Sequence, residues 1–587
     1  MIRKVFKQMT FVQILSSAMV SVCLLVDSIV IARLIGVDAV SAYGLANPLL
    51  ILFTSLGTMM SVGVQVVIGE TMGRGDVKGC TRMYSTSIGM SLILAVLWLF
   101  IVFVFTDPIC TLLGAGRPSS DNQIFTMTGE YLRGFILGAP FFFLSQVMVP
   151  YLQAMGRRKI AAVSTLAMTA VDIILDLLSV YVFHAGMFGI GIASGLSYLV
   201  AMLACIGFFL RKDCLFKFNP KGIGLKMMRH MLYAGIPVLV VQASFMVRAY
   251  FINRILMKVS GTIAVAVFAV ISTTGTICFC IGLGSGSVAL MLASIFYGEE
   301  DRSSIYELIK TMTTHSLKLI IAVMIVVELT APWIAGMFLG NYPSVLSIAI
   351  PGFRIYLLSL IPCVLANVFK NYYQGTGRMW LTNFISLCQN IILVLPCVWI
   401  LGTMMGVTGV WIGVIAGEAA TLLAFSIIVW VRNRKVSFSA EAYSLLDRDF
   451  GANPSEVFEM SVTDMDTAVG ASQKIDDFCK SKGLGSRVSM LVSLCVEEIV
   501  VNIIRHGFTQ DDSAYNADIR VVIDEKKCII RVRDNCIGFD PTSYMQLYKN
   551  DDPTAHIGIR VVMGMASEVS YMNTLGLNNL HMSILRG

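Results

Sequence analysis

Long apolar runs are the feature that most restricts what this chain can fold into. A helix needs about 20 apolar residues to cross a bilayer, and twelve stretches of that kind occur before residue 435. Charged residues make up only 14% of the chain, whereas soluble domains carry about 25%. The sequence therefore predicts an α-helical polytopic protein embedded in a lipid bilayer. The expected spans are 11–33, 45–69, 84–106, 130–153, 160–183, 187–210, 232–256, 262–290, 315–338, 350–373, 381–402 and 407–431.

Basic residues are concentrated in alternate loops between these spans. The loop after the fourth span, for example, contains Arg157, Arg158 and Lys159. Because cytoplasmic loops carry the excess of Lys and Arg, both termini are predicted to be cytoplasmic and the protein to lie in the cytoplasmic membrane. The net charge of +7 is explained by these loops, so it does not indicate a nucleic-acid partner.

Short motifs recur in the two halves of the apolar region. YLQAMGR at 151–157 matches YYQGTGR at 372–378, and GRGD at 73–76 resembles GEED at 298–301. We therefore expect a membrane domain over 1–435 that consists of two six-helix repeats, roughly 1–220 and 221–435. Six crossings in each repeat give both the same orientation, and transporters with paired repeats bind substrate between the halves near the midplane.

After residue 435 the composition becomes polar. Residues 436–455 are predicted to be a linker, and residues 456–587 a cytoplasmic α/β sandwich domain. Helical periodicity covers 467–482 and 487–505, and strand-like alternation covers 517–524 and 527–533. Further strands are expected near 567–573 and 579–585.

Three aspartates interrupt the apolar helices of the first half. Asp172 and Asp176 are four residues apart and share one helical face. At about 1.5 Å per residue, Asp27 and Asp176 lie about 23 and about 24 Å from the cytoplasmic ends of their spans, with Asp172 one turn deeper. A charge in this environment costs at least about 2.5–3.5 kcal/mol. The three carboxylates are therefore expected to form one site for H⁺ or Na⁺, although hydrogen bonds within the protein are an alternative explanation for each.

The matching positions of the second half are chemically different. They hold Arg248, Asn390 and Val394 in place of the three aspartates. Arg248 is expected either to pair with a carboxylate of the first half or to extend toward the membrane surface. Arg248 and Asn390 are retained as transport candidates, and Glu328 and Glu418 as weaker ones.

The first 435 residues resemble the multidrug and toxic compound extrusion (MATE) family. The resemblance rests on VDSI at 26–29, IGVDA at 35–39, GRGD at 73–76, QAMG at 153–156, LD at 175–176 and GIP at 235–237. It implies a bacterial secondary antiporter that exports cationic or amphipathic compounds in exchange for H⁺ or Na⁺. Asp27 and Asp176 fall on the acidic positions of the family's N-lobe, and Asp172 falls where many prokaryotic members have Asn. The glutamate that some members carry in span 7 has no match in 238–253, which favours coupling in the first half.

The tail contains three polar motifs in order. Glu498 and Asn502 are one helical turn apart; Glu498 would orient a nucleophile as catalytic base, and Asn502 would bind Mg²⁺ between phosphate oxygens. In RDNCIGFD at 533–540, Asp534 can accept a hydrogen bond from an adenine amino group. HIGIR at 556–560 opens a helix, and a helix N-terminus with glycine is suited to phosphate.

These motifs resemble the GHKL-type ATP-binding fold of anti-sigma-factor serine kinases over about 130 residues. The resemblance predicts ATP and Mg²⁺ as ligands, held by Asn502, Asp534, Gly538 and Gly558. Cys536 and His556 replace glycines of the family motifs. Three outcomes stay open: nucleotide binding alone, serine/threonine kinase or ATPase activity, and docking of a cytoplasmic protein partner.

Two other classes of function are compatible with this sequence. One is a membrane sensor that regulates an anti-sigma-type serine kinase, which would depend on an intact nucleotide site. The other is a lipid-linked oligosaccharide flippase, whose cavity tends to be basic, whereas this first half is acidic. The sequence has no Walker A run, so an ATP-driven pump is not predicted.

Overall fold

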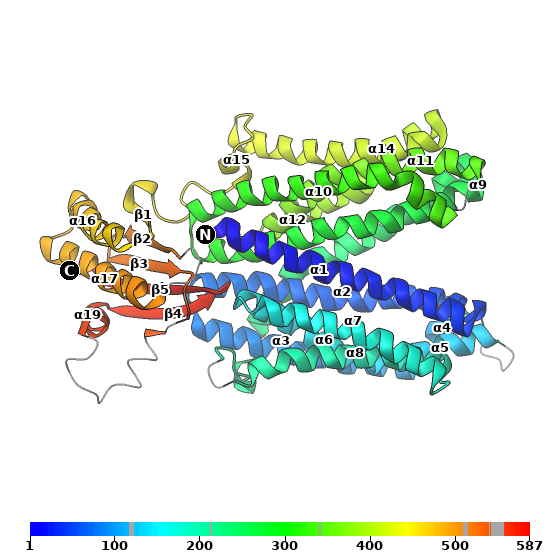
Figure 1. The fold of residues 1–587 in the computed structure, drawn as a ribbon, viewed down its shortest axis with the longest axis horizontal. Helices are drawn as coiled ribbons and strands as arrows, with labels where there is room; N and C mark the ends of the chain where they lie inside the picture. The colour runs from blue at the N-terminus through cyan, green and yellow to red at the C-terminus, as the bar shows by residue number, and fades with distance from the viewer. Residues whose placement is uncertain are drawn as a thin grey trace.

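The protein consists of a long helical bundle with a small sheet domain stacked on one end (Figure 1). The structure is a computed structural model and describes residues 1–116, 122–211, 214–339, 342–508, 515–538, 540–541 and 557–586. The N-terminus lies at the end of the bundle that meets the sheet domain.

The helices of the bundle follow the apolar runs of the sequence. The first half contains α1 (Ile2–Val30), a π-helical turn (Ile31–Ile35), α2 (Val37–Gly73), α3 (Val77–Val104), α4 (Thr106–Leu112), α5 (Gln123–Ile136), α6 (Ala139–Ala154), α7 (Arg158–Tyr181) and α8 (Gly186–Phe209). The second half contains α9 (Leu225–Gly298), α10 (Arg302–Leu339), α11 (Pro343–Leu358), α12 (Leu360–Gly375), α13 (Met379–Leu387), a π-helical turn (Cys388–Ile392) and α14 (Val394–Asn433).

Two of these helical segments fold back on themselves. In the described chain, nine segments are long and apolar enough to cross a membrane, and the bent pair of α5 and α6 makes a tenth. Straight, the 74 residues of α9 would extend about 110 Å. Instead the backbone breaks at Gly261 (φ 75°), and Met231 and Ile295, near its opposite ends, both pack against glycines of α2. The segment 379–433 breaks in the same way at Gly406 (φ 68°). Counting each arm separately gives twelve crossings, in agreement with the sequence.

Matching loops of the two halves have the same local structure. Asp76 and Asp301 each cap the following helix by accepting a hydrogen bond from the backbone amide three residues later, at 2.8 and 3.0 Å. Gly156 and Gly377 both adopt positive φ, at 70° and 76°. Because these pairs occupy the positions that recur in the sequence, they support the two-repeat organisation.

The two halves contact each other near the sheet domain. Along α1, Arg3 lies 3.5 Å from Glu307, and Gln13 donates a hydrogen bond to Ser287 at 3.2 Å. The last of these α1 contacts joins Ser21 to Cys280 at 3.8 Å. Toward the opposite end, α1 diverges from the helices of the second half (Figure 1). The halves are therefore joined by side-chain contacts toward the sheet-domain end, and the α1 ribbon diverges from the second half toward the other end.

The stretch 436–455 packs on the second half. It contains α15 (Ala440–Ser444), and its backbone carbonyls are held by side chains of the bundle. Tyr372 and Tyr373 donate their hydroxyl hydrogens to the carbonyls of Ser444 and Tyr443, at 3.0 and 2.9 Å. The segment predicted as a linker is thus fixed to the bundle along part of its length.

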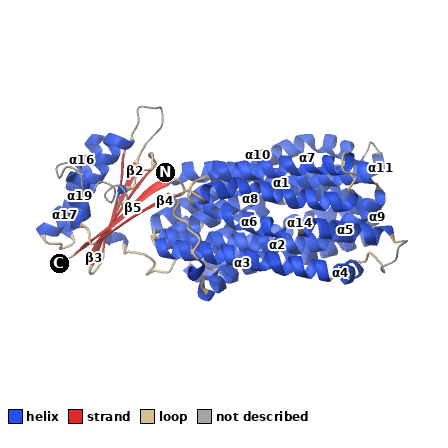
Figure 2. Cartoon of the chain, turned by 90° about the horizontal axis from the view of Figure 1, so that it is seen from below, coloured by secondary structure: helices blue, strands red, loops and turns tan. Residues whose placement is uncertain are grey.

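The sheet domain is a two-layer α/β unit. Its antiparallel sheet has the order β1-β2-β3-β5-β4, with α16, α17 and α19 on the face turned away from the bundle (Figure 2). The predicted helices and four predicted strands are present, and β1 is an additional strand. The elements are β1 (Val457–Val462), α16 (Met465–Ser481), α17 (Ser486–Asn502), β2 (Ala517–Ile523), β3 (Lys527–Asp534), α19 (Ile557–Met565), β4 (Glu568–Thr574) and β5 (Leu577–Leu585).

Candidate functional site

The three aspartates of the first half are buried together. Asp27 on α1 is 6% exposed, and Asp172 and Asp176 on α7 are 3% and 0% exposed. Because α1 packs against α7, the shared face of Asp172 and Asp176 is turned toward Asp27. The three carboxylates lie close enough for their negative charges to repel one another.

Cys23, one helical turn before Asp27, also belongs to this cluster. Its thiol donates a hydrogen bond to Asp172 Oδ2 at 2.8 Å, and ligand atoms of Cys23, Asp27 and Asp172 lie within 4.8 Å of one another. Both oxygens of Asp176, and Oδ1 of Asp27 and of Asp172, receive no hydrogen bond from any donor group in the described part of the chain. A proton or a small cation would relieve the cost of these unpaired oxygens. The four-residue spacing from Asp27 is the sequence signal that could have identified Cys23.

Aromatic side chains surround the cluster. Tyr43, Tyr131 and Tyr198 come from α2, α5 and α8 and lie within electrostatic range of Asp27. The rings of Tyr43 and Tyr131 make an edge contact with centroids 5.4 Å apart. Tyr43 and Tyr198 are partly exposed, and tyrosine faces attract organic cations.

Arg248 forms an ion pair within the second half. Its Nη1 lies 2.7 Å from Glu418 Oε1 and donates to the carbonyl of Gln389 at 3.0 Å. The side chain of Gln389 in turn donates to Glu418 Oε2 at 3.1 Å. Both placements expected for Arg248 are wrong, because Glu418, which is fully buried on α14, satisfies the guanidinium locally. Sequence reasoning treated Glu418 only as a weak candidate, since no local pattern relates residues so far apart in the chain.

Asn390 makes its hydrogen bond within its own helix. Its amide donates to the carbonyl of Ser386 at 2.8 Å, in the π-helical turn before α14. This bond gives Asn390 a structural role, and its part in transport stays a prediction. Glu328, the other weak candidate, pairs with Arg354 at 3.1 Å, and both side chains are about half exposed.

The sheet domain contains a cavity of about 420 Å³ beside the C-terminal end of α17. This volume is within the range of small-molecule sites, roughly 300–1,000 Å³. Three of the predicted nucleotide ligands, Asn502, Asp534 and Gly538, line it together. Glu498 is half-buried one turn before Asn502 and is not among the lining residues. Gly558 lies in the first turn of α19, and His556 lies outside the described residues.

Asp534 is anchored at the wall of this cavity. Its Oδ1 accepts hydrogen bonds from Asn578 Nδ2 at 2.8 Å and from the Cys536 amide at 2.9 Å. Asn578 is directly opposite Asp534 in the pairing of β3 with β5, and its Oδ1 accepts from the Tyr571 hydroxyl at 2.7 Å. Burial raises the pKa of the Asp534 carboxyl. Sequence reasoning missed Asn578 because only strand register brings it here.

Cys536 occupies the position of a family glycine without filling the cavity. Its side chain packs against Gly507, where an added Cβ would lie 3.0 Å from the sulfur. Burial raises the pKa of the Cys536 thiol to about 12, so the thiol is neutral near pH 7. A cysteine in place of the family glycine therefore forms part of the cavity wall and leaves the cavity open.

These features define a helical membrane transporter with an acidic site in one half and a sheet domain at one end. The chain belongs to the MatE family, whose model matches residues 13–178 and 237–400. The model of the histidine kinase-like ATPase domain matches residues 462–584.

Two similar relatives are bacterial export proteins. The multidrug export protein MepA of Staphylococcus haemolyticus is 26% identical over 400 residues, which are 67% of this chain and 86% of the relative. MepA of Staphylococcus aureus strain MRSA252 is 23% identical over 400 residues, again 67% of this chain and 86% of the relative.

Solved structures share the fold of the bundle. The outward-facing conformation of a multidrug resistance MATE transporter of the MOP superfamily matches with a TM-score of 0.68 and 20% identity, over 74% of this chain and 96% of that one. A Vibrio cholerae MATE transporter, VcmN, matches with a TM-score of 0.67 and 18% identity, over 73% and 97%.

Proposed function

We propose that this protein is an ion-coupled antiporter of the cytoplasmic membrane that exports cationic or amphipathic compounds. The observation that carries the proposal is the buried group of Asp27, Asp172 and Asp176, in which four of the six carboxylate oxygens receive no hydrogen bond from the described chain. The unpaired oxygens support the binding of H⁺ or Na⁺ at this group. The similarity to MepA supports export, and the basic loops support a cytoplasmic location for the termini and the sheet domain.

The arrangement of the halves suggests how exchange would proceed. With the sheet-domain end closed, the aspartates would be reached from the opposite side of the membrane. There, protonation of the aspartates, or Na⁺ binding to the cluster, would reduce its negative charge. A cationic compound held by that charge and by the surrounding tyrosines would then be released outward. Rocking of the halves would return the loaded aspartates to the cytoplasmic side.

Everted vesicles with a fluorescent cationic dye test this proposal. Asp27→Asn should abolish dye-dependent release of H⁺ or Na⁺, because the cluster loses one of its titrating groups. Asp38→Asn, at an exposed position in the first turn of α2, is the matched control and should leave release intact. Normal release from Asp27→Asn would contradict the proposal, and exchanging Na⁺ for H⁺ in the assay identifies the coupling ion.

We also propose that the sheet domain binds an adenine nucleotide with Mg²⁺. The cavity supports this assignment: Asp534 would accept from the adenine amino group, Asn502 would supply an amide oxygen to Mg²⁺, and Gly538 would allow close approach. Bound Mg²⁺ would neutralise phosphate charge.

Binding of a fluorescent ATP analogue to the purified full-length chain tests the second proposal. Asn502→Ala should remove most of the Mg²⁺-dependent binding. Asn453→Ala, at an exposed position before β1, is the control and should bind normally. An unmutated chain that binds no analogue would leave the sheet domain as a docking module. Nucleotide binding without any dye transport would instead favour the membrane-sensor class.

A further inference from the structure

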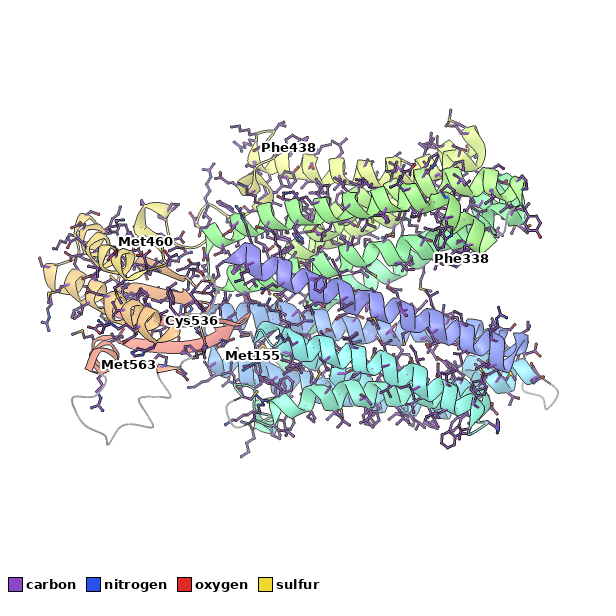
Figure 3. The ribbon with its side chains drawn as sticks, in the orientation of Figure 1. Met155, Phe338, Phe438, Met460, Cys536 and Met563 are labelled. Atoms are coloured by element: carbon purple, nitrogen blue, oxygen red, sulfur yellow. The ribbon has the colours of Figure 1, made fainter. Side chains whose placement is uncertain are left out.

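The sheet domain is anchored to the first half of the bundle by the turn between β4 and β5. The amide of Leu575 donates to the carbonyl of Ala154 at 2.5 Å, and Arg158 donates to the carbonyl of Leu575 at 3.2 Å. Gly156 packs directly on the backbone of this turn, with no room for a side chain. Met155, in the same loop, lies where the bundle meets the sheet domain (Figure 3).

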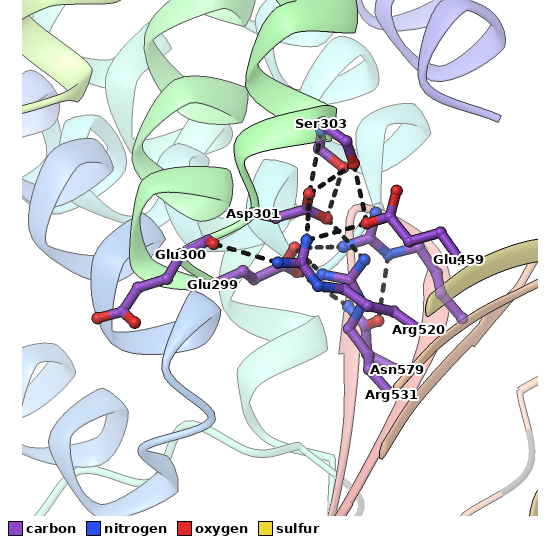
Figure 4. Close-up of polar contacts among 10 residues, drawn as sticks. Glu299, Glu300, Asp301, Ser303, Glu459, Arg520, Arg531 and Asn579 are labelled. Carbon is purple, nitrogen blue, oxygen red and sulfur yellow. Dashed lines mark hydrogen bonds and ion pairs between the residues drawn. The ribbon is translucent and has the colours of Figure 1, made fainter. Parts of the chain in front are cut away.

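The same sheet is anchored to the second half by three arginines. Arg531 pairs with Glu299 at 2.8 Å and with Asp301 at 2.6 Å. Arg520 pairs with Asp301 (Figure 4), and Arg533 pairs with Glu299. Both acids belong to the loop between α9 and α10, and all five side chains are buried. We call these five residues the arginine anchor.

The arginine anchor depends on charges from both partners. Arg520 and Arg531 are directly opposite each other on β2 and β3, where like charges repel. Burial alone would raise the pKa of Asp301, but Arg531 and Arg520 hold that pKa well below its usual range. The sheet itself supplies Glu459 on β1, which lies 3.2 Å from Arg520, whereas Glu299 and Asp301 supply the carboxylates that pair with Arg531 and Arg533. The contact is specific, because removing either the acidic or the basic side chains would leave the opposite charges buried without partners.

One row of the sheet reaches both halves. Cross-strand pairing aligns Arg520, Arg531, His581 and Ser570 from β2 to β4. At one end of the row Arg520 contacts the loop 298–301, and at the other Ser570 faces Gly75 in the loop 73–76. These loops are the matching loops of the two repeats, so the sheet connects equivalent points of the two halves.

We propose that the sheet domain is a clamp that holds the two halves closed at this end, and that nucleotide in its cavity releases it. Alternating access requires the halves to move apart where the sheet now joins them. The turn between β4 and β5 and the arginine anchor cannot both persist through that movement without deforming the sheet. The second part of the proposal rests on the nucleotide binding proposed above.

The cavity and the arginine anchor are connected through adjacent positions of two strands. Asp534 and Asn578 face the cavity, and their neighbours Arg533 and Asn579 face the bundle, because successive strand residues point to opposite sides. Arg533 Nε donates to Asn579 Oδ1 at 3.2 Å on that side. An adenine amino group that donates to Asp534 would compete with the hydrogen bond from Asn578 to the same carboxylate. A shift of Asp534 or Asn578 would then move the strand backbone that also carries Arg533.

Hydrogen–deuterium exchange of the full-length chain in lipid nanodiscs tests the clamp. Glu299→Gln combined with Asp301→Asn removes the acidic charges, while the asparagine can still cap α10. Exchange at the Leu575 amide should become about tenfold faster as local opening becomes easier, and dye transport should rise. Glu441→Gln with Asp449→Asn neutralises two exposed acids of the same region and should change neither. Unaltered exchange and transport in the first variant would overturn the clamp.

The nucleotide step is tested on the unmutated chain with a non-hydrolysable ATP analogue and Mg²⁺. Occupancy is measured separately by fluorescence, so a failure to bind is distinguished from a failure to release. Bound analogue should accelerate exchange at Leu575 and in the peptide covering 298–304, and Asn502→Ala should prevent this. Bound analogue that leaves exchange unchanged, or slows it, would overturn release by nucleotide.

Discussion

The two halves of the bundle share a fold but treat buried charge in opposite ways. In the first half, three carboxylates lie together with oxygens that receive no donor from the described chain. In the second half, Arg248 and Glu418 neutralise each other, with Gln389 bridging them. An ion pair that is already neutral gains little by binding an external ion, whereas a group of unpaired carboxylates is stabilised by binding a cation. The contrast explains why coupling is assigned to one half although both contain ionisable residues.

The largest expected effect is on the acidic cluster. Asp176→Asn should abolish ion-coupled transport, because it removes the carboxylate with the fewest partners. It should leave thermal stability unchanged or higher, since an amide is cheaper to bury than an unpaired carboxylate. Transport in proteoliposomes and thermal unfolding of the same preparation check both results. Retained coupling would remove the distinction between the two halves.

Breaking the pair in the second half should instead destabilise the protein. Arg248→Met leaves Glu418 buried without its partner and should cost about 3–5 kcal/mol. Adding Glu418→Gln to that variant should recover most of the loss, because no unpaired charge is left. Thermal unfolding of the single and double variants measures the difference. A single variant as stable as the unmutated chain would show that the pair is not structural.

The docked sheet should weaken in mild acid. Burial and the nearby Arg531 lower the pKa of His581 to about 4, from an ordinary value of about 6.5. Below pH 6.5 an exposed His581 takes up a proton, whereas the docked His581 stays neutral until about pH 4. The free energy that favours docking is therefore complete above pH 6.5 and decreases as the pH falls toward 4, by about 1–2 kcal/mol at pH 5. His581→Gln should remove this pH dependence of exchange at Leu575. An identical profile in that variant would exclude His581 as its source.

The smallest effect is expected at the matching loops. Gly75 has φ 70° in the first half, and Glu300 has φ 53° at the equivalent position of the second. A non-glycine residue in the left-handed region costs about 1 kcal/mol. Glu300→Gly should therefore stabilise the protein by up to about 1 kcal/mol, while the backbone carbonyl that Arg520 contacts is kept. A lower unfolding temperature would show that the Glu300 side chain has a role of its own.

Local patterns were enough to predict much of the fold. Apolar runs of bilayer length located the spans, and strand alternation located β2, β3, β4 and β5. Spacing also placed Asp172 and Asp176 on one face, and the resemblance to the GHKL fold placed Asn502 and Asp534 in one site. Strand β1 was missed, because 457–462 is short and partly polar.

The residues that the sequence left unassigned are those whose partners lie far away in the chain. The sequence alone shows that Asp27 and Arg248 lie in apolar spans, so each buried charge needs a partner, an ion or access to water. Whether each finds a partner depends on helix packing, which joined Arg248 to Glu418 and left Asp176 unpaired. Strand register decided that Asn578 meets Asp534, and packing of the sheet on the bundle decided that Arg531 meets Glu299. These pairings arise from long-range contacts, and no periodicity within a helix or strand encodes them.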